Sequence, residues 1–259
     1  MILNNRLLIK FLLLSFFFTY LLWGSIAFAN CFGYLEWGTP FSMLFYVSGT
    51  LAPTVVAFIC LKQSGSIKTI KDFAKITFSF RGKPAHYLMV FMFLAVLYVP
   101  SIILNGTNSD TAWYLWILVL VPMLLAGGLE EPAWRYLLQP TLEKRFPFLI
   151  ATAITAVIWW AWHLPLFLID GSGQTEMSLI QYALLIFGLS LSLATIFKIS
   201  KNIWLCVMFH TLINSLAIYW SIATDLTASL ISLVGIIVLS VIIMLKHKTA
   251  RVRQSKGSS

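Results

Sequence analysis

The sequence predicts an all-α protein, a polytopic membrane helix bundle of about eight transmembrane helices, from three observations. Of the 259 residues, 59% are hydrophobic and only 10% are charged, with a mean hydropathy of +0.88, whereas soluble domains average about 25% charged residues. Apolar stretches of about 20 residues, the length that crosses a bilayer, recur along the whole chain. All 18 basic residues fall on one side of the membrane when alternate loops are assigned to it.

The first predicted span needs separate treatment, because Arg6, Lys10 and the sequence 27–29 (Ala-Phe-Ala) imitate a secretory signal with its cleavage site. The apolar run is long for a signal peptide, so we favour an uncleaved span. The fourth predicted span is interrupted by Glu130 and Glu131. The eight predicted spans are 7–29, 41–61, 85–104, 113–139, 147–169, 178–197, 202–220 and 226–245.

The distribution of charge predicts that both termini are cytoplasmic in a multi-pass cell-membrane protein. The short N-terminus without a targeting presequence makes a bacterial plasma membrane the preferred setting. The net charge of +9 comes from basic residues that lie in the loops between apolar spans. No nucleic-acid partner is therefore expected. The tail after Lys246 is interpreted as an irregular solvated extension. The outer loops contain no Lys or Arg and only acids: Glu36, Asp110, Asp170, Glu176 and Asp225.

Three regions are predicted along the chain. Residues 1–112 hold three N-terminal spans with a basic cytoplasmic loop, residues 113–220 form a core that contains the unusual polar residues, and residues 221–259 form the last span and the tail. The three cysteines show neither a disulfide framework nor a metal-binding spacing.

Polar residues within the core are the main functional signal. An ionisable side chain inside a span costs about 2.5–3.5 kcal/mol on insertion scales, so it indicates function by default. At about 1.5 Å per residue, Glu130, His210 and Asn214 lie roughly 12–18 Å from the cytoplasmic end of their spans, and His163 lies roughly 21–24 Å from it. Trp159 shares a helical face with His163 and can shield its ring from lipid. Each residue could instead serve interhelical packing, but their similar depth on three helices favours a site.

The local spacing separates structural from chemical roles. Glu131 and Arg135 are four residues apart and can pair along one helix face, so we interpret them as supporting structure. Glu130 is left without that partner and is a candidate general base. His210 and Asn214 are also four residues apart and present an imidazole and an amide together.

Three motifs in this region resemble those of the CPBP family, which comprises CAAX proteases and bacteriocin-processing enzymes formerly grouped as Abi proteins. Residues 130–135 (Glu-Glu-Pro-Ala-Trp-Arg) match its EExxxR motif, residues 159–163 resemble its FxxxH motif, and residues 210–214 match its HxxxN motif. Trp159 stands where the second motif has Phe, which preserves an aromatic side chain. The resemblance covers about residues 115–220.

The resemblance implies an intramembrane endopeptidase that opens toward the cytoplasm and acts on membrane-associated or lipidated peptide or protein substrates. It implies that Glu130 activates a water with help from His163, and that His210 and Asn214 stabilise the oxyanion. Peptide maturation and bacteriocin self-immunity are the biological roles associated with bacterial members. No cofactor is favoured.

Zinc is the alternative cofactor, because Glu130, His163 and His210 could hold it and the family is widely labelled as metalloprotease. HExxH is absent, and Asn214 is a better oxyanion donor than a zinc ligand, so a metal-free glutamate mechanism is preferred. Two functions other than proteolysis are also compatible with the sequence. One is a non-catalytic scaffold or regulator of the same fold, and the other is a proton-coupled transporter, although no internal repeat supports the latter.

Overall fold

A computed structural model describes residues 4–106, 111–220 and 225–256, and within these ranges the chain forms helices and connecting loops without a strand. The predicted all-α class is therefore confirmed. The helices in chain order are α1 (Asn5–Cys31), α2 (Pro40–Gln63), α3 (Ile70–Thr77), α4 (Pro84–Asn105), α5 (Leu115–Leu118), α6 (Leu120–Leu125), the 3₁₀ turn η1 (Gly128–Glu130), the π-helix η2 (Pro132–Leu138), α7 (Gln139–Leu142), α8 (Phe148–Trp162), the 3₁₀ segment η3 (Leu164–Leu168), α9 (Leu179–Ser200), α10 (Ile203–Leu216) and α11 (Leu226–Lys256).

Six of the predicted spans are helices long and apolar enough to cross a membrane within the described residues. The seventh predicted span corresponds to α10, which has 14 residues and is shorter than the 202–220 stretch that we expected. The polytopic helical bundle is confirmed, and the chain is a multi-pass membrane protein.

The fourth predicted span, 113–139, is wrong as a single helix. It is divided into α5, α6, η1, η2 and the start of α7. Pro122, Pro132 and Pro140 each lack the backbone donor that a continuous helix needs, and Gly127 and Gly128 lie between them. Such irregular backbone is tolerated at membrane depth only where protein covers it, and residues 130–135 are indeed buried.

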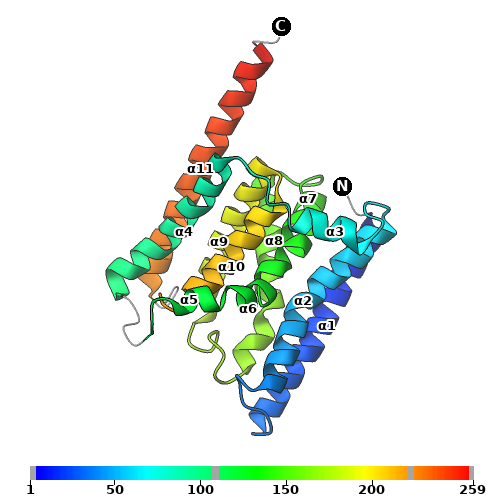
Figure 1. The fold of residues 1–259 in the computed structure, drawn as a ribbon, viewed down its shortest axis with the longest axis vertical. Helices are drawn as coiled ribbons and strands as arrows, with labels where there is room; N and C mark the ends of the chain where they lie inside the picture. Colours follow the sequence, from blue (N-terminus) through cyan, green and yellow to red (C-terminus); the bar gives the residue numbers. More distant parts are fainter. Residues whose placement is uncertain (1–3, 107–110, 221–224, 257–259) are drawn as a thin grey trace.

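The helices form a bundle in which both described ends of the chain lie at the same end of the molecule, together with α3 (Figure 1). Helix α1 packs against α2 on one edge, and α11 packs against α4 and α9. Between these edges α8 packs against α9, and α10 packs against α6 and η1. Helices α5 and α6 run across the bundle rather than along it (Figure 1).

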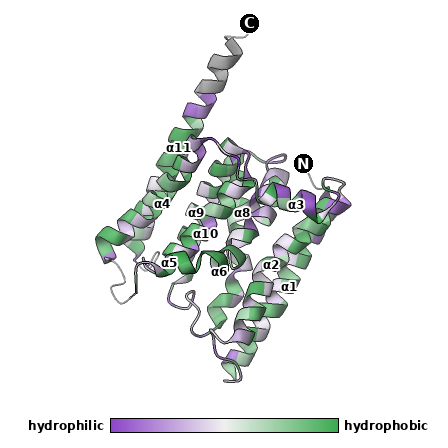
Figure 2. Ribbon diagram, viewed as in Figure 1, coloured by the Kyte–Doolittle hydropathy of each residue, from purple (hydrophilic) through white to green (hydrophobic). Residues whose placement is uncertain are grey.

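Polarity follows this arrangement. Apolar residues dominate the shafts of the long helices, and hydrophilic residues gather around α3 and the N-terminal end (Figure 2). Phe11 and Trp23 of α1 are buried, and Thr19 donates to the Gly49 carbonyl of α2 at 2.8 Å, so the first span is an integral part of the bundle. The irregular tail that we expected after Lys246 is wrong, because α11 continues as a helix to Lys256.

Candidate active site

Glu130 ends the short η1 turn, in the most irregular part of the chain. The two glycines before it allow close approach of α10. A Cβ at Gly127 would collide with the amide nitrogen of Asn214 and lie 3.1 Å from His210 Nε2, and a Cβ at Gly128 would collide with the Thr211 hydroxyl. The backbone that holds Glu130 therefore packs directly against the helix that contributes His210 and Asn214, because small residues let two helices approach closely.

The Glu130 carboxylate is buried, with 3% of its surface exposed, and it is oriented by two indoles. Its Oε2 accepts a hydrogen bond from Trp159 Nε1 at 2.8 Å and a second from Trp134 Nε1 at 3.2 Å. Among the described residues no hydrogen bond engages its other oxygen, Oε1. One carboxylate oxygen is thus fixed and the other remains available to a substrate water.

Glu131 connects Arg135 and His210 and is fully buried. Its Oε2 lies 3.2 Å from Arg135 Nε, and its Oε1 lies 2.7 Å from His210 Nδ1. Arg135 also donates to Ser190 at 2.9 Å and lies 4.9 Å from the centre of the Trp159 ring. The pairing of Glu131 with Arg135 agrees with the sequence interpretation. The bond to His210 adds a link that spacing did not predict, because the two residues lie 79 positions apart.

His163 lies where α8 ends, and the structure explains that end. Pro165 follows two residues later and cannot continue an α-helix, so the chain proceeds into the 3₁₀ segment η3. His163 Nδ1 lies 2.8 Å from the Trp159 carbonyl. Since a carbonyl only accepts, Nδ1 carries the proton and Nε2 is left as the free ring nitrogen. The Trp159 ring contacts both His163 and His210, with centroids 5.5 and 5.4 Å apart.

Asn214 lies one turn beyond His210 on α10, and its side chain is directed toward the loop before η1. Asn214 Nδ2 donates to the Ala126 carbonyl at 3.3 Å, a long bond that uses one of its two N–H groups. The ring of His210 is held through Nδ1 by Glu131, so its Nε2 faces the same space.

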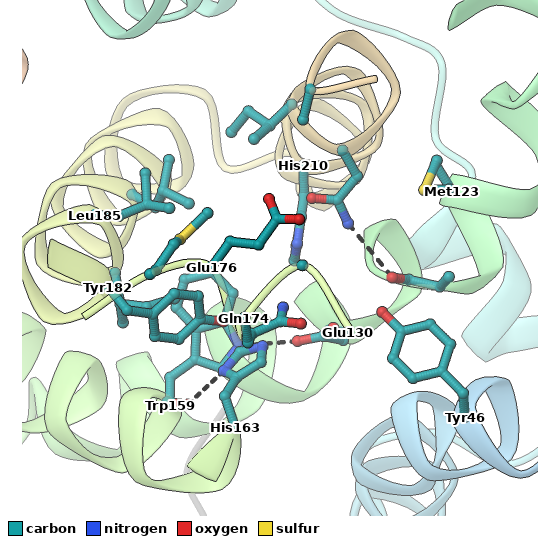
Figure 3. A pocket seen from close by; sticks show the side chains of 18 of the residues that line it. Tyr46, Met123, Glu130, Trp159, His163, Gln174, Glu176, Tyr182, Leu185 and His210 are labelled. Carbon is teal, nitrogen blue, oxygen red and sulfur yellow. Dashed lines mark hydrogen bonds between the residues drawn. The ribbon is translucent and has the colours of Figure 1, made fainter. Parts of the chain in front are cut away.

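These side chains surround a cavity of about 500 Å³. Figure 3 shows Glu130, His163 and His210 directed into it from three different elements. Of the predicted site residues, Glu130, His163, His210, Asn214 and Trp159 line the cavity, whereas Glu131 and Arg135 lie behind it. The structure therefore brings the four predicted catalytic residues together at one cavity.

Several lining residues were missed by sequence reasoning. Trp23 and Tyr46 come from α1 and α2, which contain no family motif, and Gln174, Glu176 and Tyr182 come from the α8–α9 connection and the start of α9. No spacing pattern links these residues to the motifs, so only packing could reveal them. Trp134 was also missed, although its position four residues after Glu130 was a usable signal for a contact along one face.

The cavity opens at the end of the bundle opposite both described chain ends. Trp37 comes from the α1–α2 connection, Gly173 and Met177 come from the α8–α9 connection, and Ile218 follows α10. All of these segments lie away from α3 and from the chain ends (Figure 1). The sequence predicts cytoplasmic termini and a cytoplasmic opening of the site, whereas these loops and the chain ends lie at opposite ends of the bundle (Figure 1); the orientation of each in the membrane stays a prediction.

The alternative zinc site can be compared with the arrangement of its donors. No group of three His, Cys, Asp or Glu side chains within the described ranges is placed to hold a metal ion. The described residues thus form no three-ligand group for zinc, and the metal-free mechanism stays a prediction that chelation tests.

The fold and the site together define a polytopic membrane protein with a buried glutamate–histidine site inside its helix bundle. Residues 112–216 match the family described as Type II CAAX prenyl endopeptidase Rce1-like. A curated relative, CAAX prenyl protease 2 of Methanococcus maripaludis, is 28% identical over 229 residues, which cover 79% of this chain and 81% of the relative. The resemblance to the CPBP family of intramembrane proteases is therefore confirmed.

Proposed function

We propose that this chain is an intramembrane endopeptidase in which Glu130 activates the hydrolytic water. The observation that most directly supports this is the Glu130 carboxylate, which lines the cavity, is buried, and accepts from two indole donors at Oε2, while no hydrogen bond in the described residues engages Oε1. Amide hydrolysis requires a positioned base for the water and donors for the tetrahedral oxygen. Both kinds of group line this cavity, whose walls leave room for a peptide segment.

In the proposed mechanism Glu130 Oε1 takes a proton from a water while the water oxygen attacks the scissile carbonyl carbon. His163 holds that water through Nε2, the ring nitrogen that its bond to the Trp159 carbonyl leaves free. A tetrahedral intermediate with one negatively charged oxygen results. Glu130 then transfers the proton to the leaving nitrogen, the C–N bond breaks, and a carboxylic acid and an amine are released.

His210 and Asn214 are proposed to stabilise the oxyanion. Asn214 retains one N–H beyond its bond to the Ala126 carbonyl. His210 acts through Nε2, which requires that nitrogen to carry a proton while Nδ1 donates to Glu131. The carboxylate of Glu131 supports that role because it balances the charge of a doubly protonated ring. Preorganised donors of this kind contribute about 10²–10³ in rate for each donor.

The substrates are proposed to be membrane-associated or lipidated peptides, because the cavity lies inside a bundle whose long helices are rich in apolar residues (Figure 2) and expose many large hydrophobic side chains. The name of the curated relative, CAAX prenyl protease 2, supports a prenylated tail as one candidate. Peptide maturation and self-immunity against bacteriocins remain proposed biological roles.

The decisive experiment replaces Glu130 by glutamine in the full chain, reconstituted in proteoliposomes with a library of lipid-anchored fluorogenic peptides. Glutamine keeps the volume and can still accept from both indoles, but it cannot take a proton from water. Turnover should fall by about 10²–10⁴ while the protein stays folded. Asn214→Ala should lower the rate by about 10²–10³ with little change in KM.

Gln174→Ala is a suitable control, because this residue lines the same cavity without a role in the proposed chemistry. It should retain hydrolysis within an order of magnitude. If Glu130→Gln cleaves the peptides at the wild-type rate, the glutamate mechanism is wrong and another group activates the water. If the wild-type protein cleaves none of the peptides, the scaffold interpretation is favoured.

A further inference from the structure

The position of the cavity along the bundle is the starting observation. Its lining comes from the lower half of α1 and α2, the C-terminal ends of α8 and α10, and the N-terminal half of α9. These segments all lie at the end remote from α3 and from both described chain ends (Figure 1). The N-terminal half of α8 and the C-terminal half of α9, which reach the other end, contribute no lining residue.

The charges of the chain separate along the same axis. The basic loop around α3, the α7–α8 and α9–α10 connections, and the basic tail all lie at the end that carries the termini. The loops at the cavity end contain no Lys or Arg in the sequence, and they include Glu36, Asp170 and Glu176. Lys and Arg concentrate in short cytoplasmic loops of membrane proteins, so the cavity end is the extracytoplasmic one.

The mouth of the cavity is acidic. Glu176, on the α8–α9 connection, is exposed and lines the cavity, and in Figure 3 it lies with Gln174 beside the two site histidines. No hydrogen bond or ion pair engages the Glu176 carboxylate within the described ranges. None of the residues that line the cavity is Lys or Arg, and the remaining walls are largely aromatic and aliphatic.

We propose that substrates reach this site from the extracytoplasmic face and that Glu176 at its mouth selects peptides with a cationic residue near the scissile bond. This rests on the proposed endopeptidase function. The substrate class is then a membrane-associated peptide whose cleaved segment is exposed outside the cytoplasm. A free C-terminal carboxylate next to the scissile bond is disfavoured, because the cavity lining offers it no cation and two carboxylates, Glu130 and Glu176.

The direction of entry can be tested with a native residue, independently of catalysis. Cys31 is exposed at the cavity end of α1, whereas Cys60 and Cys206 are buried. An impermeant maleimide added to intact cells that express the full chain should label wild-type protein and the inactive Glu130→Gln variant equally, and Cys31→Ser should abolish labelling. A second variant, Cys31→Ser with Lys68→Cys, places a thiol on the exposed loop before α3 and should react only after permeabilisation. Labelling of Lys68→Cys but not of Cys31 in intact cells would overturn extracytoplasmic entry while leaving the hydrolytic mechanism intact.

The selectivity of Glu176 is measured on two lipid-anchored peptides that differ only in lysine or norleucine beside the scissile bond. Wild-type protein should favour the lysine peptide in kcat/KM by about two- to fivefold, the range of an exposed ion pair, and the preference should shrink at high salt. Glu176→Gln should abolish the preference without lowering turnover of the norleucine peptide. Glu36→Gln, on the same face but outside the cavity lining, should retain it. An unchanged preference in Glu176→Gln, or no preference in the wild type, contradicts the assignment.

Discussion

Replacing Arg135 by methionine tests whether the buried charge network is structural support or part of the chemistry. Methionine retains an apolar stem of similar reach but removes the guanidinium. Two bonds are lost, from Nε to Glu131 at 3.2 Å and from Nη1 to Ser190 at 2.9 Å, in a side chain with no exposed surface. The Glu131 carboxylate then keeps only His210 as a partner. Breaking a buried pair in this way costs about 3–5 kcal/mol of unfolding free energy.

A second pair in the same chain serves as a matched control. Lys198 and Glu143 form an ion pair near the surface, with 36% and 17% of their side chains exposed. Lys198→Met should cost only about 0–1 kcal/mol. Both variants are compared with the wild type by equilibrium unfolding in mixed micelles of denaturing and mild detergents. Hydrolysis of a lipid-anchored peptide is measured on the same preparations.

The reasoning is refuted if Arg135→Met unfolds with the wild-type free energy yet fails to cleave, because Arg135 would then contact the substrate. Adding Glu131→Gln to Arg135→Met removes the stranded charge. This double variant should recover part of the stability but not the activity, because His210 has lost its carboxylate partner.

Three further outcomes follow from the geometry of the site. Gly127→Ala places a methyl group against the Asn214 amide and should lower kcat by about 10²–10³, whereas Gly24→Ala, which meets nothing within 4 Å, should leave kcat unchanged. Trp159→Phe removes the 2.8 Å hydrogen bond to Glu130 but keeps an aromatic ring. Since a hydrogen bond to a charged acceptor contributes about 1.5–3 kcal/mol, kcat should fall about tenfold or more. An unchanged kcat would show that this donor does not position the base. Exhaustive chelation should leave hydrolysis intact, and stoichiometric zinc whose removal abolishes cleavage and whose return restores it would replace the glutamate mechanism.

The sequence predicted the membrane spans and several side-chain pairs of the site, because these features depend on residues close together in the chain. Spans are recognised because a bilayer demands about 20 apolar residues in a helix, and this requirement identified the class of protein. The pairing of Glu131 with Arg135 and the shared face of His210 and Asn214 depend only on helical spacing. Each of these features involves neighbours within one or two turns.

What the sequence could not determine involves contacts between distant elements. Glu131 binds His210 from 79 residues away, and Trp159 donates to Glu130 from 29 residues away; both depend on how far each helix is rotated and how deep it sits. Protein covers the irregular backbone of residues 130–135 in the broken fourth span, and residue patterns do not reveal that cover. The end of the bundle at which the cavity opens depends on how the ends of α8 and α10 pack against the start of α9. Helical spacing specifies which residues share a face of one helix. It does not specify where the packed helices leave a cavity.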